Sequence, residues 1–160
     1  MTSGQMMLAL GAIVMLSTLA LTLNSIVLDG NRVMMESELY VSGTSVAQSF
    51  VEHAAVLAFD ASVGSLDPST FPGSFTSPGG LGPKSGENYP NFNDVDDFNG
   101  YSATVSTTRA DFNVSITVKY CDESGNASAN RTFFKKMEVT ASNPSIPTSI
   151  VVRRIFAYSI

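Results

Sequence analysis

The first 28 residues carry no charged side chain, and this stretch limits the fold of the chain more than any other feature. From Met6 to Leu28 the sequence is apolar over about 23 residues, which is long enough for a helix to cross a bilayer. Such a segment does not belong to the core of an ordinary water-soluble domain. We therefore treat residues 1–28 as an apolar helix for a membrane or for the core of a protein assembly.

A second helical pattern follows the apolar run after a short polar break at 29–32. Its apolar residues recur every three or four positions: Leu39, Tyr40, Gly43, Val46, Ala47, Phe50, Val51, Ala54, Leu57 and Ala58. We predict one helix of about 55 residues, apolar over 1–28 and amphipathic over 29–58. Gly30 costs about 1 kcal/mol of helix stability, so a bend or an unwound turn is expected there if anywhere.

Residues 59–100 form a loop region with a high density of helix and strand breakers. Between 61 and 100 lie five of the seven prolines and seven of the twelve glycines, which leaves only short regular pieces. Apolar anchors recur along the region, and they are Phe59, Phe71, Phe75, Leu81, Tyr89 and Phe92. We therefore expect the loop to lie ordered against its own domain or a neighbouring subunit.

The last part, 101–160, contains four strand-like runs at 101–107, 112–120, 131–140 and 150–158. Short separators rich in turn formers join them, which favours antiparallel neighbours. The predicted fold class is α+β: a long N-terminal helix packed through its stripe Leu39 to Ala58 on a four-stranded antiparallel sheet in meander order.

Residues that could carry chemistry are few. One histidine and one cysteine leave no catalytic or metal-binding set, so we expect neither an enzyme nor a cofactor. Asp94, Asp96 and Asp97 offer oxygen ligands for calcium, but they lack the EF-hand spacing with its distal glutamate. Turn-forming Asx residues that lead into a strand explain them equally well.

The charges are spread unevenly along the chain. Residues 29–97 hold ten acidic and two basic side chains, whereas residues 98–160 hold four acidic and seven basic ones. Such a chain can attract copies of itself head to tail, or its charges can simply keep it soluble. The pairs Lys135-Lys136 and Arg153-Arg154 split their charge across a strand, because adjacent residues point to opposite faces. We expect ordinary surface charge or contact with the acidic loop of a neighbour, and no need for nucleic acid.

Three N-glycosylation sequons begin at Asn113, Asn126 and Asn130. The first lies on a strand facing away from its apolar neighbours, and the other two lie in a predicted turn. All three are expected to be accessible. Chance sequons are also expected in a chain rich in Asn, Ser and Thr, so these residues remain candidates for modification.

The start of the chain resembles a mature type IV pilin. The resemblance covers the first 58 residues: Met1-Thr2, a polar residue at position 5, an apolar run to the high twenties and an amphipathic half to the fifties. It implies that Met1 is the first residue after prepilin peptidase has removed a leader, and that it is N-methylated. It also implies assembly through Met1 and position 5, where pilins usually have a glutamate that neutralises the amino terminus of a neighbouring subunit.

Gln5 departs from that pattern, because its carbonyl can accept a hydrogen bond but cannot cancel the charge of an ammonium group. The resemblance implies a structural subunit of an extracellular pilus-like filament, a homo-oligomer that is membrane-inserted before the pilus machinery assembles it. A pseudopilin of a secretion system and a membrane-anchored surface domain that binds a partner are the alternatives. A permanent anchor needs only about 20 apolar residues and usually has basic flanks, whereas Asp29 comes first here.

Overall fold

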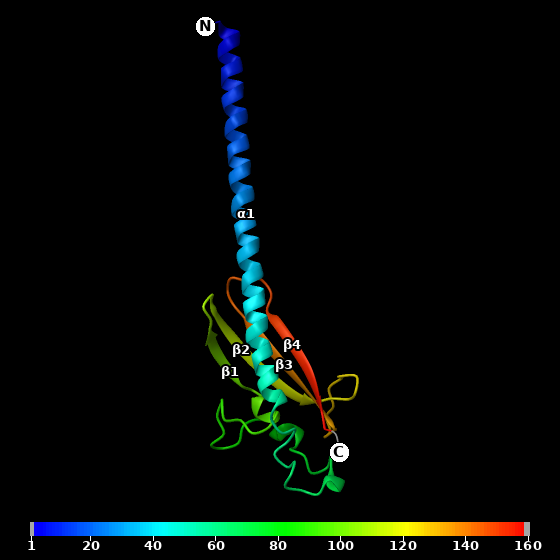
Figure 1. Ribbon diagram of the computed structural model, residues 1–160. Coiled ribbons are helices and arrows are strands. Elements are labelled where there is room, and N and C mark those ends of the chain that lie inside the picture. The colour runs from blue at the N-terminus through cyan, green and yellow to red at the C-terminus, as the bar shows by residue number, and fades with distance from the viewer. Residues whose placement is uncertain (1, 159–160) are drawn as a thin grey trace. The chain divides into compact units, whose positions relative to one another are not determined.

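The computed structural model describes residues 2–158, which form one long helix, a loop region and a four-stranded sheet (Figure 1). The chain divides into two compact units, Met1–Glu38 and Leu39–Ile160. We call the second unit the head domain. Helix α1 (Ser3–Ala55) supplies all of the regular structure in the first unit and the covering helix of the second. The predicted α+β fold class is confirmed.

The first unit is a single exposed stretch of α1. The large apolar side chains from Met6 to Leu28 are each 55–77% exposed. Helix α1 continues through Gly30, so the unwound turn considered at this glycine is not formed. Since this unit contributes no residue to a core, its helical state depends on local propensity and on whatever surrounds it.

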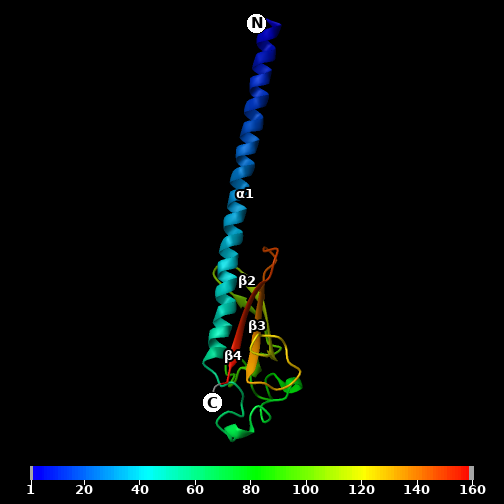
Figure 2. The same cartoon turned by 90° about the vertical axis from the view of Figure 1, so that its right-hand side faces the viewer.

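The sheet of the head domain is an antiparallel meander. Its strands are β1 (Ser102–Ser106), β2 (Asp111–Tyr120), β3 (Phe134–Ser142) and β4 (Ile150–Ala157), in the order β1-β2-β3-β4. Strand β2 alternates strictly between exposed and buried residues, as expected for a sheet with one covered face. Figure 2 shows the C-terminal part of α1 lying along that covered face.

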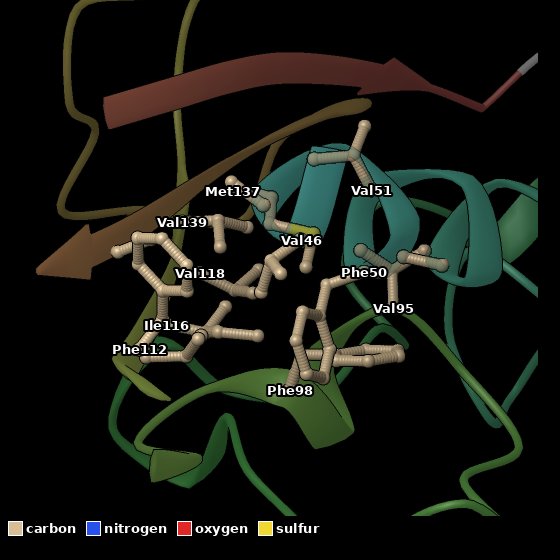
Figure 3. Packing of buried hydrophobic residues seen from close by; sticks show 14 of the residues in the cluster. Val46, Phe50, Val51, Val95, Phe98, Phe112, Ile116, Val118, Met137 and Val139 are labelled. Atoms are coloured by element: carbon tan, nitrogen blue, oxygen red, sulfur yellow. The ribbon is translucent and has the colours of Figure 1, made fainter. Parts of the chain in front are cut away.

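The main core lies between this part of α1 and the sheet (Figure 3). Val46, Phe50 and Val51 of the helix pack with strand residues such as Ile116 and Val139, all less than a tenth exposed. The buried helix positions are Leu39, Gly43, Val46, Ala47, Phe50, Val51 and Ala54, which agrees with the predicted stripe. The helix ends at Ala55, so Leu57 and Ala58 of that stripe lie beyond it and are only partly buried.

The loop region packs on the helix and sheet of the head domain, as expected. It contains three short 3-10 helices, η1 (Pro68–Thr70), η2 (Pro78–Gly80) and η3 (Asp96–Phe98). Of its expected anchors, Phe59, Phe71, Phe75 and Phe92 are buried, Leu81 is half-buried, and Tyr89 is 39% exposed. A second, aromatic cluster therefore forms beside the main core, and its buried members are Phe59, Phe71, Phe75 and Tyr120.

The start of β3 differs from the sequence expectation. The run 131–140 was expected to be strand throughout, but β3 begins at Phe134. Thr132 accounts for the late start, because its hydroxyl shares its one proton between the carbonyls of Cys121 and Phe134 and accepts from the Phe134 amide. These local bonds compete with ladder pairing. The buried face of β3 then begins at Lys135 and continues through Met137, Val139 and Ala141.

Candidate assembly helix and buried lysine cluster

The hydroxyl groups within the apolar part of α1 bond back to their own helix. Ser17 Oγ donates to the Ile13 carbonyl at 2.8 Å, and Thr22 Oγ1 donates to the Thr18 carbonyl at 2.9 Å. Thr18 and Ser25 make equivalent bonds three residues back. A hydroxyl satisfied in this way can lie in an apolar environment without a desolvation penalty. The polar residues of the segment are thus compatible with lipid or with neighbouring helices.

Gln5 lies at the beginning of α1 and closes its first turn. Its Oε1 accepts a hydrogen bond from the Thr2 amide at 3.1 Å, while the Thr2 carbonyl accepts from the Gln5 amide at 3.0 Å. This is half of a capping box, in which a Glu or Gln at the third helical position reaches back to the N-cap. The segment Thr2-Ser3-Gly4-Gln5 has the sequence pattern of a capping box. Met1, the other expected assembly residue, lies outside the described residues.

A buried lysine forms the second notable site, within the head domain. Lys135 is 0% exposed, and its Nζ donates to Asp96 Oδ1 at 2.6 Å, Asp60 Oδ2 at 2.9 Å and the Phe59 carbonyl at 2.7 Å. The ammonium group also lies 4.5 Å from the centre of the Phe59 ring. All three ammonium protons are used, as a buried charge requires. The cluster joins strand β3 to both ends of the loop region.

The carboxyl groups around Lys135 have different environments. Burial acts to raise the pKa of Asp60, but the Lys135 charge and the amides of Thr76 and Ser62 outweigh it and lower that pKa to about 2. Burial raises the pKa of Asp94 to about 7, and the Asp96 carboxylate beside it adds to the effect. At neutral pH the Asp60 carboxylate is therefore firmly ionised, whereas the Asp94 carboxyl group readily holds a proton.

The three aspartates considered for calcium are bound by donors of their own chain. Asp96 is taken up by Lys135, Asp94 Oδ1 accepts from the amides of Asp96 and Asp97, and Asp97 Oδ2 accepts from the amide of Asn93. Within residues 2–158 no group of three His, Cys, Asp or Glu side chains is placed to hold a metal ion. The arrangement agrees with the alternative interpretation, in which Asx residues shape a turn before β1.

The sequon asparagines are all exposed, but they differ in their contacts. Asn113, on β2, accepts from Thr104 Oγ1 at 2.9 Å, and Asn126 Nδ2 donates to Asp122 Oδ2 at 2.9 Å. In the third sequon, Asn130 is exposed but the Thr132 hydroxyl is occupied by backbone carbonyls. Exposure alone therefore leaves all three as candidate modification sites.

Lys135 is the residue that the sequence interpretation misplaced. It was expected to be surface charge or to meet an acidic loop of a neighbour, and that expectation is wrong, because the acidic loop it meets belongs to its own chain. The alternation of β3 carried a usable signal. Lys135 has the same parity along the strand as the apolar residues Met137 and Val139, which lie on the buried face of β3.

The molecule thus offers an exposed apolar helix with internally satisfied hydroxyls and a buried ionic cluster in the head domain. The helix is long and apolar enough to cross a membrane, and its most apolar window has no buried residue. Compared with known proteins, the chain matches no family model, no curated protein and no solved structure.

Proposed function

We propose that this chain is a structural subunit of an extracellular, type IV pilus-like helical filament, stored in the membrane and assembled through residues 3–38 of α1. The observation that carries the proposal is the exposure of every large apolar side chain from Met6 to Leu28, on a helix that continues without a break into the helix of a folded head domain. Transfer of each CH₂ group of this helix into water costs about 0.8 kcal/mol. The segment therefore needs lipid before assembly and other copies of itself afterwards.

Two further features support transfer of the helix from lipid to the core of a filament. The hydroxyl groups of Ser17, Thr18, Thr22 and Ser25 need no partner outside the helix. Gly4 and Gly11 have no neighbouring atom within 4 Å of where a Cβ would lie, so they leave room for a second helix to approach closely. Transfer from lipid to a protein core of similar polarity is nearly neutral, so small biases of this kind can direct assembly. Repeated head-to-tail contacts that do not close would give a filament.

The direct test is to shear filaments from the cell surface and identify their subunit by peptide sequencing. The proposal expects this chain as a principal component of the sheared fraction. Recovery of the chain solely as a membrane-bound monomer would instead favour a permanently anchored surface domain. Recovery in short periplasm-spanning structures, with none released by shearing, would favour a pseudopilin.

A sharper test separates insertion from assembly by adding volume at Gly11. Gly11→Leu keeps the segment apolar, so insertion into membranes should be unchanged, while filament yield should fall strongly because the helices can no longer approach there. Ala12→Leu is the matched control, since it adds apolar volume one position along on another side of the helix. Equal filament yields for both variants would contradict a role for close packing at Gly11.

Substitutions of Gln5 test whether this residue takes part in assembly. Gln5→Ala removes both the hydrogen bond to Thr2 and any bond to a neighbouring terminus, so filament yield should decrease. Gln5→Glu keeps the capping bond and adds the carboxylate that pilins usually have here, so its yield should equal or exceed that of the unmodified chain. Unchanged yield in Gln5→Ala would show that the residue is passive in assembly.

A further inference from the structure

The lysine cluster of the head domain places an amine, two acceptor carboxylates and a proton-holding carboxyl within a dry site. Lys135, Asp60, Asp94 and Asp96 are each 0–1% exposed. Lys135 comes from β3, Asp60 follows α1, and Asp94 and Asp96 lie at the beginning of η3. Residues that are distant in sequence therefore meet where water has been excluded.

We propose that Lys135 and Asp96 condense to form an intramolecular amide bond that joins strand β3 to the loop region. The Asp96 Oδ1 oxygen lies 2.6 Å from Lys135 Nζ. Contact at this distance brings the attached carboxyl carbon to about the 3–3.5 Å separation from which an amine attacks a carbonyl. The head domain thus holds the reacting atoms in place before any bond has formed.

Asp96 is a better electrophile than Asp60 because fewer groups stabilise its anion. The Asp60 carboxylate accepts from the Ser62 amide, the Ser62 hydroxyl and the Thr76 amide in addition to Lys135. Asp60 is therefore held as an ionised carboxylate that stabilises the nearby positive charge, and it is a poor site of attack. The Asp96 carboxylate lies beside Asp94 and has Lys135 as its near donor.

Asp94 is placed to protonate the oxygen atom that leaves Asp96 when the amide forms. Its Oδ1 accepts from the amides of Asp96 and Asp97, whereas its Oδ2 is buried and has no hydrogen-bond donor among the described residues. A proton on Oδ2 lets Asp94 donate to the adjacent Asp96 carboxylate. Burial and the neighbouring negative charge favour that proton, since they raise the pKa of Asp94 to about 7.

The reaction balances without any further reagent. One C–N bond forms between Lys135 Nζ and Asp96 Cγ, one C–O bond of Asp96 breaks, and one water molecule leaves. Of the three ammonium protons, one stays on the amide nitrogen, one passes to the departing oxygen and one replaces the proton that Asp94 gives to the same oxygen. Asp60 stays ionised throughout and Asp94 ends protonated as it began, so no oxidant or reductant is needed.

Burial of the cluster also favours the amide over the separate ammonium and carboxylate groups. In water, hydration stabilises a separate ammonium and carboxylate relative to their amide. At 0–1% exposure this hydration is lost, and a neutral amide costs less to bury than two charges. The bond would bridge β3 and the loop covalently, at the point where the ionic cluster now holds them together.

Mass spectrometry of the full-length chain, extracted in detergent and denatured, tests the proposal directly. Trypsin cuts the unlinked chain into separate peptides that hold Asp60 (33–84), Asp96 (85–109) and Lys135 (132–135). An amide on Lys135 blocks the cut after this residue, so its peptide then ends at residue 136. We expect a branched peptide that combines 85–109 with 132–136 and is lighter than their sum by one water, with fragment ions that place the link at Asp96. Unlinked peptides, or a link between 132–136 and 33–84, would overturn the assignment. This measurement needs no variant to fold.

Two matched variants test the role of Asp94 as the proton donor. Asp94→Asn keeps an oxygen for the amides of Asp96 and Asp97 but loses the acid proton, so the bond should form at least about 100-fold more slowly, the usual contribution of a general acid. Asp97→Asn removes a neighbouring carboxyl that is not bonded to Lys135 and should keep the branched peptide. Equal bond formation in both variants, each checked for fold by circular dichroism, would overturn the role of Asp94.

Discussion

Helix α1 contains two parts with opposite environments. From Ser3 to Glu38 the helix exposes nearly all of its side chains, whereas from Leu39 to Ala55 it buries a stripe that forms half of the head domain's main core. The first part therefore depends on lipid or on other proteins for its surroundings, and the second part is stabilised within its own chain. Four predictions, in order of decreasing effect, test this division.

The largest effect is expected from removal of residues 1–28. The shortened chain should leave the membrane fraction and remain in aqueous solution, because every large exposed apolar residue from Met6 to Leu28 is deleted. Its head domain should unfold cooperatively, since the core does not use the deleted residues. Partition between aqueous and detergent phases, followed by thermal denaturation, measures both. Aggregation with loss of cooperative unfolding would contradict the independence of the head domain.

The second prediction concerns Gly43, in the buried part of the helix. A Cβ at this position would overlap with Ile150 Cδ1 and would lie 2.8 Å from Phe112 Cε1. Gly43→Ala should therefore destabilise the head domain by about 1–3 kcal/mol, despite the higher helix propensity of alanine. Denaturant unfolding of the chain without residues 1–28 gives the value. An increase in stability would show that Ile150 and Phe112 move aside at little cost.

The sequence predicted these two parts of α1 because each follows a local pattern, an uncharged apolar run in the first and a helical repeat in the second. The uncharged run and the spacing of residues such as Leu39, Val46 and Phe50 reflect local rules of helix burial. The cluster around Lys135 depends instead on contacts with Asp60 and Asp96, which lie 75 and 39 residues away in the sequence. Strand parity indicates which face Lys135 occupies, but it does not indicate which carboxylates of the loop will meet it.

The third prediction uses pH. Residues 1–28 carry no charged side chain and titrate only at the terminal amine, at about pH 8, so changes at lower pH should act on the head domain. The pKa of Asp94 is raised from 3.8 to about 7 by burial and by Asp96. Its contribution to stability is thus fully present below about pH 4 and is lost as pH rises to about 7. Asp60, with its pKa lowered to about 2, acts oppositely and loses its contribution as pH falls below about 4.

Thermal unfolding between about pH 2 and 8, measured on chain in which Lys135 and Asp96 are still unlinked, should therefore show greatest stability near pH 4, since the proposed amide would remove both of their charges. Asp94→Asn should remove the decline between pH 4 and 7 and keep the loss of stability at lower pH, which belongs to Asp60. Asp97 has a pKa raised mainly by burial, so Asp97→Asn should remove a part of the same decline. A decline that is unchanged in Asp94→Asn would assign it to another group.

The smallest effect is expected at Gly30, in the exposed part of the helix. No atom lies within 4 Å of a Cβ built there, so Gly30→Ala gains helix propensity without a steric cost. The gain of about 1 kcal/mol should slow amide exchange around residue 30 by about fivefold in detergent micelles. The same substitution at Gly43 should accelerate exchange in the head domain, because there the added methyl group meets packed side chains. If Gly30→Ala leaves the amide exchange rate around residue 30 unchanged, the helix is already open at Gly30 in the micelle. A continuous helix at Gly30 would then depend on contacts made in the filament.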